Sequence, residues 1–166
     1  DEIIIPVPTF SMYEARARVC GAVPVLVPLR PDFSWDTDGI LAAVSDKTKL
    51  IFTCTPNNPI GNAMPLDELE RILGLGIPTV IDEAYYELES EPHTLAYLIK
   101  EYPHAIIIRT FSKAYGLAGL RVGYALADAR VIDYMLRVRL PWNVSLIALA
   151  AALAAFEDKE DLQYKR

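Results

Sequence analysis

Short, continuous apolar runs recur along this chain, and they constrain its fold more than any other feature. They lie at residues 3–5, 23–29, 50–54, 79–81 and 106–108. In runs of this length with hardly any polar residues, the side chains on both faces of the strand are apolar. This pattern is typical of strands in a parallel sheet that is covered on both sides. The segments between them carry apolar residues at helical spacing. The alternation predicts an α/β fold: a doubly wound, mostly parallel sheet with helices on both faces.

Capping and turn residues place the helices between these strands. Pro6 and Pro8 are expected to close the first strand, because proline lacks the amide N–H that a strand ladder uses. A further strand is expected from Val122 to Leu126. The first expected helix has Thr9 as its cap, runs to about Val19 and ends at Gly21. The second starts at Asp36 or Thr37 and has Ile40, Leu41 and Val44 on one face. Further helices are expected from Pro65 to Leu73, near Thr94 to Glu101, and from Asp128 onward.

Composition and charge exclude several classes of function. The net charge of −6 gives no support to nucleic-acid binding, which would show as a basic excess. The apolar run from Val144 to Phe156 is too short to span a bilayer and is rich in alanine, as in a packed helix. Cys20 and Cys54 lack metal-ligand spacing, so we expect no metal site and two reduced, interior thiols. Without a secretory signal, the expected location is the cytoplasm, away from any membrane.

A lysine follows the fifth of these strands, in the stretch from Arg109 to Gly116, and Arg121 comes eight residues after it. Ligands of open α/β sheets bind at the carboxyl ends of strands, so Thr110, Ser112 and Lys113 stand where chemistry is expected. An amine can form a Schiff base, and a guanidinium can bind a phosphate through two hydrogen bonds. The stretch therefore indicates a site for a phosphate-bearing carbonyl compound, although a solvated surface lysine is the commoner role of this residue type.

Polar residues also follow the third and fourth expected strands. Asn57 and Asn58 come after the third, and Asp82 and Tyr85 come after the fourth. Each has an ordinary structural explanation on its own, since Asn-Asn-Pro is a common turn, Asp82 can cap a helix and Tyr85 can pack half-buried. Parallel strands with right-handed crossovers bring their carboxyl ends to one edge of the sheet. Their joint appearance therefore favours a single site.

Five stretches carry a resemblance to a known family. Thr-Pro-Asn-Asn-Pro-Ile-Gly at 55–61, Asp-Glu-Ala-Tyr at 82–85 and Ser-Lys-Ala-Tyr-Gly-Leu-Ala-Gly-Leu-Arg-Val-Gly at 112–123 resemble the ordered signatures of fold-type I pyridoxal-phosphate aminotransferases. Pro-Thr-Phe-Ser-Met-Tyr at 8–13 and Leu-Pro-Trp-Asn-Val-Ser at 140–145 look like the histidinol-phosphate aminotransferase subgroup. The resemblance spans nearly the whole chain, and the lysine stretch with its arginine is its most specific part.

The resemblance implies that pyridoxal 5'-phosphate is the cofactor and that three residues carry the catalysis. Lys113 would form the Schiff base with the cofactor's aldehyde and later move a proton between the substrate α-carbon and the cofactor. Asp82 would pair with the pyridine nitrogen, because a carboxylate keeps that nitrogen protonated and lets the ring accept electrons. Tyr85, together with Asn58, would hydrogen-bond the ring's 3-oxygen.

The remaining roles follow from the same resemblance. Thr110, Ser112 and Arg121 would hold the phosphate. Phe10 would stack on the ring, in place of a more usual tyrosine, and keeps the aromatic face while losing a hydroxyl. Asn143 would lie near the substrate. We also expect Lys113 to be buried, since burial and the neighbouring arginine both disfavour the ammonium form.

The resemblance also sets the expected organisation. Residues 1–140 would be a partial large cofactor-binding domain, and residues 141–166 would begin the connection to a mostly absent small domain. The phosphate-binding turn and the substrate-carboxylate arginine of the family are not located here, so we expect a truncated large domain from a longer protein. The expected partners are small amino-acid and keto-acid substrates and a second copy of the chain in a homodimer.

The implied reaction is transamination between histidinol phosphate or imidazole-acetol phosphate and glutamate or 2-oxoglutarate, in histidine biosynthesis. An aromatic aminotransferase or a threonine-phosphate decarboxylase would keep the same cofactor motifs, because substrate choice resides largely in other segments. A non-catalytic remnant is the alternative from a different class. The presence of Lys113, Asp82 and Arg121 together argues against such decay.

Overall fold

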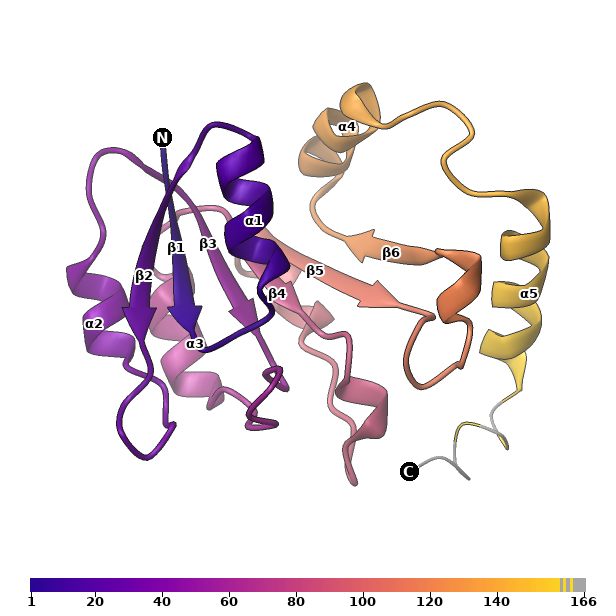
Figure 1. The fold of residues 1–166 in the computed structure, drawn as a ribbon, viewed down its shortest axis with the longest axis horizontal. Coiled ribbons are helices and arrows are strands. Elements are labelled where there is room, and N and C mark those ends of the chain that lie inside the picture. The colour runs from indigo at the N-terminus through magenta and orange to yellow at the C-terminus, as the bar shows by residue number, and fades with distance from the viewer. Residues whose placement is uncertain (159, 161, 163–166) are drawn as a thin grey trace.

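The computed structural model describes residues 1–158, 160 and 162. Within that part of the chain, six strands form one sheet in the order β2-β1-β3-β4-β5-β6 (Figure 1). Strands β1 to β5 are parallel, and β6 runs antiparallel to β5. The strand bounds are β1 Glu2–Val7, β2 Val23–Pro28, β3 Thr48–Cys54, β4 Thr79–Asp82, β5 Ala105–Thr110 and β6 Gly123–Leu126. The mostly parallel sheet expected from the apolar runs is confirmed.

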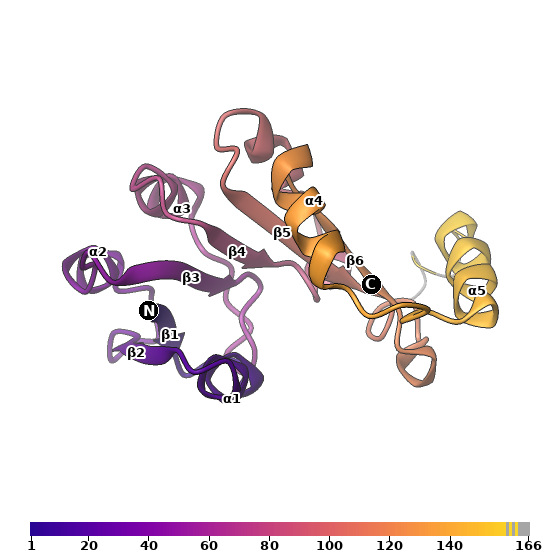
Figure 2. The same ribbon diagram turned by 90° about the horizontal axis from the view of Figure 1, so that it is seen from above.

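Helices lie on both faces of this sheet. Figure 2 shows α1 and α4 on one side and α2 and α3 on the other. The helix bounds are α1 Met12–Val19, α2 Thr37–Ala42, α3 Leu66–Leu73, α4 Ala129–Val138 and α5 Leu146–Glu157, with 3-10 turns η1 Tyr86–Leu88, η2 Ala96–Lys100 and η3 Ala118–Leu120. None of the described helices has the length and apolar character that crossing a membrane would require.

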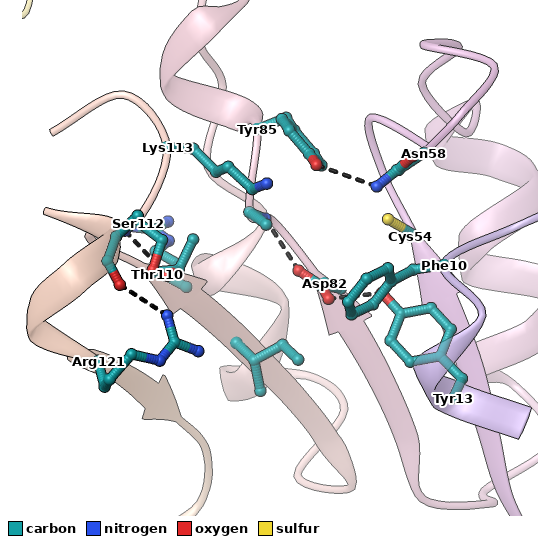
Figure 3. A pocket seen from close by; sticks show the side chains of 14 residues that line it. Phe10, Tyr13, Cys54, Asn58, Asp82, Tyr85, Thr110, Ser112, Lys113 and Arg121 are labelled. Carbon is teal, nitrogen blue, oxygen red and sulfur yellow. Dashed lines mark hydrogen bonds between the residues drawn. The ribbon is translucent and has the colours of Figure 1, made fainter. Parts of the chain in front are cut away.

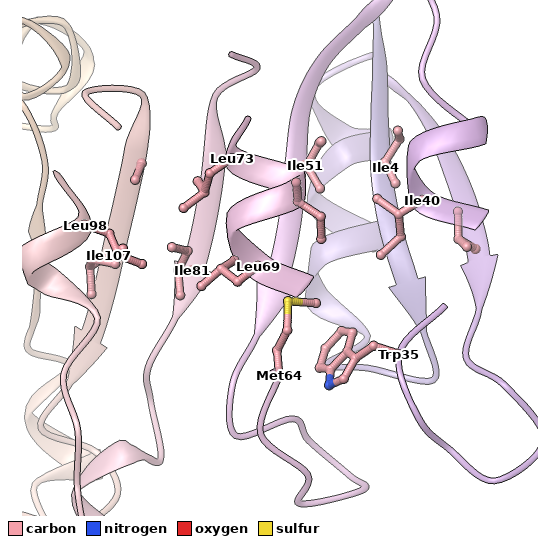
Figure 4. Packing of buried hydrophobic residues seen from close by; sticks show 13 residues of the cluster. Ile4, Trp35, Ile40, Ile51, Met64, Leu69, Leu73, Ile81, Leu98 and Ile107 are labelled. Carbon is pink, nitrogen blue, oxygen red and sulfur yellow. The ribbon is translucent and has the colours of Figure 1, made fainter. Parts of the chain in front are cut away.

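The larger hydrophobic core lies between the sheet and helices α2 and α3 (Figure 4). Strands β1, β3, β4 and β5 each direct one isoleucine into this core, and helix α3 contributes the apolar side chains of its buried face. Removing one such side chain from water contributes roughly 1.5–3 kcal/mol. The fully buried members of this core include Ile4, Ile51, Ile81, Ile107, Leu69, Ile72 and Leu73.

A smaller core lies under α1 on the opposite face. Tyr13 and Ala17, four residues apart on that helix, pack with Ile5 of β1 and Cys54 of β3. This packing fixes the helix over the carboxyl ends of the central strands. The burial of Cys54 is as expected, but Cys20 is exposed at the C-cap of α1, so its expected interior position is wrong.

Proline does not end the first strand where the sequence predicts. Pro6 lies within β1 and is aligned with Val27 of β2. Strand β3 is paired with β1 only as far as Ile4, so beyond that residue β1 is paired on one side alone. A missing amide N–H is tolerated at such a half-paired position.

Two helix boundaries also differ from prediction. Ser11 is the N-cap residue of α1, whereas the Thr9 hydroxyl donates to Asn57 Oδ1 at 2.8 Å and so links the ends of β1 and β3. Thr94 does not start a helix, because its hydroxyl accepts from the Ala96 amide at 3.0 Å and only the short turn η2 follows. Asp36 and Asp128, in contrast, cap α2 and α4 through their carboxylates.

The C-terminal helices have little contact with the sheet. Helix α4 has no buried residue, and in α5 only Ala148 and Ala152 are buried, against Phe111, Tyr115 and Val122. Helix α5 therefore packs on the loop between β5 and β6, which carries the lysine stretch.

Candidate active site

A cavity of about 340 Å³ opens at the carboxyl ends of β3, β4 and β5, beside the start of α1 (Figure 3). The structure brings together all of the residues expected to bind a cofactor. Those lining the cavity are Phe10, Asn58, Asp82, Tyr85, Thr110, Ser112, Lys113 and Arg121. Asn143 does not line this cavity and is exposed in the loop between α4 and α5.

Asp82, the last residue of β4, is held from two sides. The Tyr13 hydroxyl donates to Oδ2 at 2.5 Å, and the Ala84 amide donates to Oδ1 at 2.9 Å. Burial raises the pKa of the Asp82 carboxyl, while these two hydrogen bonds and the charge of Lys113 act in the opposite direction. Both carboxylate oxygens are thus held by hydrogen-bond donors at a buried position.

Tyr13 is a site residue that the sequence reasoning missed. It lies on the buried face of α1, and its ring stacks on Phe52 at 4.7 Å between centroids. Burial and the adjacent Asp82 charge raise the pKa of its hydroxyl, so Tyr13 keeps its proton and acts as the donor to Asp82. A signal was present, because Tyr13 belongs to the stretch from Pro8 to Tyr13 that carries part of the family resemblance.

Asn58 and Tyr85 form a hydrogen-bonded pair at the next strand end. The Asn58 Nδ2 atom donates to the Tyr85 hydroxyl at 3.0 Å. Since that hydroxyl accepts from Asn58, its own proton is free to point at a ligand in the cavity. The pair therefore presents a directed O–H donor from the turn after β3 and the turn after β4.

Lys113 reaches the cavity from the loop between β5 and β6. Its Nζ atom lies 5.2 Å from the centroid of the Tyr85 ring. Gly116 has φ of +69°, which side chains rarely adopt, and a Cβ at Gly123 would meet the Arg109 carbonyl oxygen at 2.6 Å. Lys113 is exposed, so the expectation that it is buried is wrong for this chain. Helix α5 packs on Phe111 and Tyr115 of this loop, while the Lys113 side chain stays exposed.

A polar group gathers on the other side of the cavity. Figure 3 shows Thr110, Ser112 and Arg121 together there, away from Phe10 and Tyr13. The Thr110 hydroxyl accepts from the Ser112 amide at 3.0 Å, and Arg121 Nη1 donates to the Ala118 carbonyl at 2.8 Å. Hydroxyls with a guanidinium are the chemistry that recognises a phosphate.

The opposite wall is apolar. The Phe10 ring meets the Tyr13 ring edge to face at 5.6 Å and exposes 43% of its surface, which leaves one face for a flat ligand. Cys54 lies beneath, where burial raises the pKa of its thiol to about 11. The thiol is therefore protonated at neutral pH and serves as a packing group.

Comparison with protein families decides the identity of this fold. The model of the family described as aminotransferase class I and II matches residues 1–165. The chain belongs to this aminotransferase family. Membership of this family is consistent with both the mostly parallel sheet and the sequence of the stretch around Lys113.

Similar aminotransferases carry two different substrate names. A histidinol-phosphate aminotransferase of Methanosarcina mazei is 47% identical over 163 residues, which cover 98% of this chain and 44% of that protein. An aromatic amino acid aminotransferase of Rhodococcus opacus is 45% identical over 165 residues, covering 98% of this chain and 46% of that protein. The chain thus spans about half the length of the curated relatives it matches.

A solved aminotransferase shares the same fold. The histidinol-phosphate aminotransferase from Sinorhizobium meliloti, in complex with pyridoxal-5'-phosphate, superposes with a TM-score of 0.86 at 30% identity. The match covers 99% of this chain and 46% of that one. The described sheet and helices are therefore those of a fold-type I aminotransferase.

Proposed function

We propose that this chain forms the cofactor-binding part of a pyridoxal-phosphate-dependent aminotransferase, with the cofactor in the cavity of about 340 Å³. The observation that carries the proposal is the convergence of a carboxylate, an amine and a guanidinium on one cavity. Asp82, Lys113 and Arg121 come from different segments, and each matches one functional group of the cofactor: the ring nitrogen, the aldehyde and the phosphate. Family membership and the pyridoxal-phosphate complex of a related aminotransferase support it.

The donor set fits this cofactor residue by residue. Thr110, Ser112 and Arg121 would hold the phosphate through hydroxyl and guanidinium donors. Phe10 would cover one face of the ring. Tyr85, whose hydroxyl accepts from Asn58 at 3.0 Å, would direct its own proton to the ring's anionic oxygen.

Pyridoxal phosphate supplies an electron-accepting ring that stabilises negative charge on an attached α-carbon. Lys113 would bind the aldehyde through Nζ and, when free, would hold and release a proton on that atom. The Asp82 carboxylate, fixed by donors from Tyr13 and Ala84, would keep the ring nitrogen protonated. These roles need an ionised Asp82, which the charge on the ring nitrogen favours against the effect of burial.

The cofactor assignment is tested by covalent trapping. Purified protein is incubated with pyridoxal phosphate, reduced with borohydride, and mapped by mass spectrometry of its peptides. We expect one adduct, on Lys113, and its complete loss in Lys113→Ala. Lys100→Ala, which removes an exposed lysine in η2, is the matched control and should retain the adduct. An adduct on another lysine, or none on the wild-type protein, would refute the assignment.

For the substrate, we propose histidinol phosphate and imidazole-acetol phosphate, with glutamate and 2-oxoglutarate as the other pair. The relative named for histidinol phosphate, at 47% identity, supports this choice. An aromatic amino acid is the second candidate, because a relative of nearly equal identity carries that name. Half-reactions of the cofactor-loaded protein with histidinol phosphate, phenylalanine and threonine phosphate would rank the candidates, and the fastest donor identifies the class.

The remaining expectations are proposals of the same kind. Residues 1–140 would belong to a large cofactor-binding domain, and residues 141–166 would lead toward a small domain. Asn143 would contact the substrate only when further parts of the protein bring it to the cavity. We also propose a homodimer in the cytoplasm, acting in histidine biosynthesis.

A further inference from the structure

A buried ion pair joins Glu83 to Arg109, which is one of the residues that line the cavity. Arg109 donates to Glu83 Oε2 through Nε at 2.8 Å and through Nη2 at 2.6 Å. The Glu83 side chain is 0% exposed and the Arg109 side chain 9% exposed. A buried charge pair costs desolvation energy, which only good geometry and additional hydrogen bonds repay.

Those additional hydrogen bonds are present on both partners. Glu83 Oε1 accepts from the Leu95 amide at 2.6 Å. Arg109 Nη1 donates to the Tyr86 hydroxyl at 2.9 Å and lies 3.3 Å from the Tyr124 hydroxyl, and Arg109 also contacts Thr94.

The guanidinium is further stabilised in its charged form. It sits 4.0 Å from the centroid of the Tyr86 ring. Burial lowers the pKa of Arg109, but its hydrogen bonds to Tyr124 and Glu83 outweigh that effect and leave the pKa raised. The pair is therefore a fixed connection between β4, β5, β6 and the segment from Tyr86 to Leu95.

Sequence position makes this connection relevant to the cavity. Glu83 directly follows Asp82, and Arg109 directly precedes Thr110. Because neighbouring strand residues point to opposite faces, the side chains of Glu83 and Arg109 lie on the face of the sheet opposite to those of Asp82 and Thr110. Arg109 is nevertheless among the residues that line the cavity. The Glu83 amide also donates to the Ile108 carbonyl at 2.9 Å.

We propose that Glu83 and Arg109 are positioning residues that set the place of the Asp82 carboxylate relative to the loop from Thr110 to Lys113. The inference rests on the proposed function, since it concerns where two groups of the cofactor site stand with respect to each other. Neither side chain is assigned a contact with cofactor or substrate. They act through the residues next to them in sequence.

The test compares Glu83→Gln and Arg109→Lys with a matched surface pair. Glu83→Gln keeps the size and an acceptor oxygen for Leu95 but removes the charge, and Arg109→Lys keeps the charge but loses the planar fork. The control variants Asp38→Asn and Arg71→Lys break an exposed pair of the same type, 2.6 Å long, that joins α2 and α3. Glu83→Gln is the milder change and is sufficient alone if Arg109→Lys does not fold.

Three readouts are taken. Hydrogen exchange of the cofactor-free protein follows the peptides covering residues 82–86 and 110–115. Absorbance of the protein loaded with pyridoxal phosphate is titrated against pH. A half-reaction with the best amino donor gives kcat and KM.

We expect faster exchange in both peptides, a displaced pH midpoint of the absorbance change, and a kcat lower by about 100-fold, as for a small misplacement of reacting groups. KM should change by less than about threefold, because substrate contacts are untouched. The control variants should match the wild type in all three readouts.

Two results would overturn the inference and are distinguishable. Variants that lose thermal stability but keep the wild-type pH midpoint and kcat would show a purely structural pair, with the proposed function intact. A wild-type protein that takes up no pyridoxal phosphate would overturn the proposed function, and the inference with it.

Discussion

Two regions of the molecule are both rich in apolar residues but bury very different fractions of their apolar side chains. The parallel region consists of strands β1 to β5 with helices α1 to α3, and the C-terminal region consists of β6 with α4 and α5. Ile51 and Ile81 of the parallel region are 0% exposed. In the C-terminal region Val138 and Leu146 are each 82% exposed, and Trp142 between them is 95% exposed. An apolar stripe in the sequence therefore indicates that a segment can pack against another element. The stripe is buried only where the fold places such an element against it.

The candidate site follows the same division. Its residues come from the strand ends of the parallel region and from the loop between β5 and β6, and none comes from α4 or α5. Asp82 and Tyr13 are fixed by buried contacts, whereas Lys113, on the loop against which α5 packs, is exposed. The carboxylate of the candidate site is thus buried, whereas its lysine is exposed.

The largest expected difference between the regions is in core stability. Ile51→Ala should lower the free energy of unfolding by about 2–5 kcal/mol, since it removes buried methyl groups and leaves a cavity. Leu153→Ala, at a side chain 60% exposed on α5, should change it by less than about 0.5 kcal/mol. Chemical denaturation of both variants measures the two values. Equal losses would contradict the burial difference.

A smaller difference is expected between two tyrosine hydroxyls. Tyr13→Phe removes the donor to Asp82 and should lower the free energy of unfolding by about 1–3 kcal/mol, because a buried acceptor loses its partner. It should also weaken uptake of pyridoxal phosphate. Tyr134→Phe, at a side chain 67% exposed on α4, should leave both quantities near the wild-type values. A Tyr13→Phe protein with unchanged cofactor affinity would remove Tyr13 from the site.

The smallest expected effect concerns Asp82 and Asp128, whose contributions to the free energy of unfolding should depend on pH with opposite signs. Burial raises the pKa of Asp82 in the folded protein, so its stabilising contribution is present below the unfolded-state pKa and is lost as pH rises through the folded-state pKa. Hydrogen bonds from Arg130 lower the pKa of Asp128, so its contribution is present above the unfolded-state pKa and is lost as pH falls through the folded-state pKa.

Single asparagine variants separate these two contributions in the cofactor-free protein. Asp82→Asn should flatten the fall of stability with rising pH, and at neutral pH should raise the midpoint of thermal unfolding by less than Tyr13→Phe lowers it. Asp128→Asn should flatten the fall of stability at acidic pH. Thermal unfolding measured across the acidic and neutral range checks both slopes, and equal slopes in the two variants would show that Asp82 is not desolvated.

The strand pattern and the polar strand ends could be predicted because they depend on local order. Apolar runs predict buried parallel strands, and parallel strands place Asn58, Asp82 and Lys113 at one edge whatever the details of packing. Element boundaries were harder: Pro6 lies inside β1 because β3 stops pairing beforehand, and Thr9 bonds to a residue 48 positions away instead of capping a helix. Both depend on neighbours that are distant in sequence.

The sequence by itself therefore determined the fold class, the family and eight of the fourteen residues that line the cavity. Only the tertiary structure decided which side chains hold those residues in place. The bond from Tyr13 to Asp82 and the pair of Glu83 with Arg109 join residues 69 and 26 positions apart. The physical reason is that spacing along a chain fixes which face a side chain takes, whereas hydrogen-bond partners across elements are set by how the elements pack.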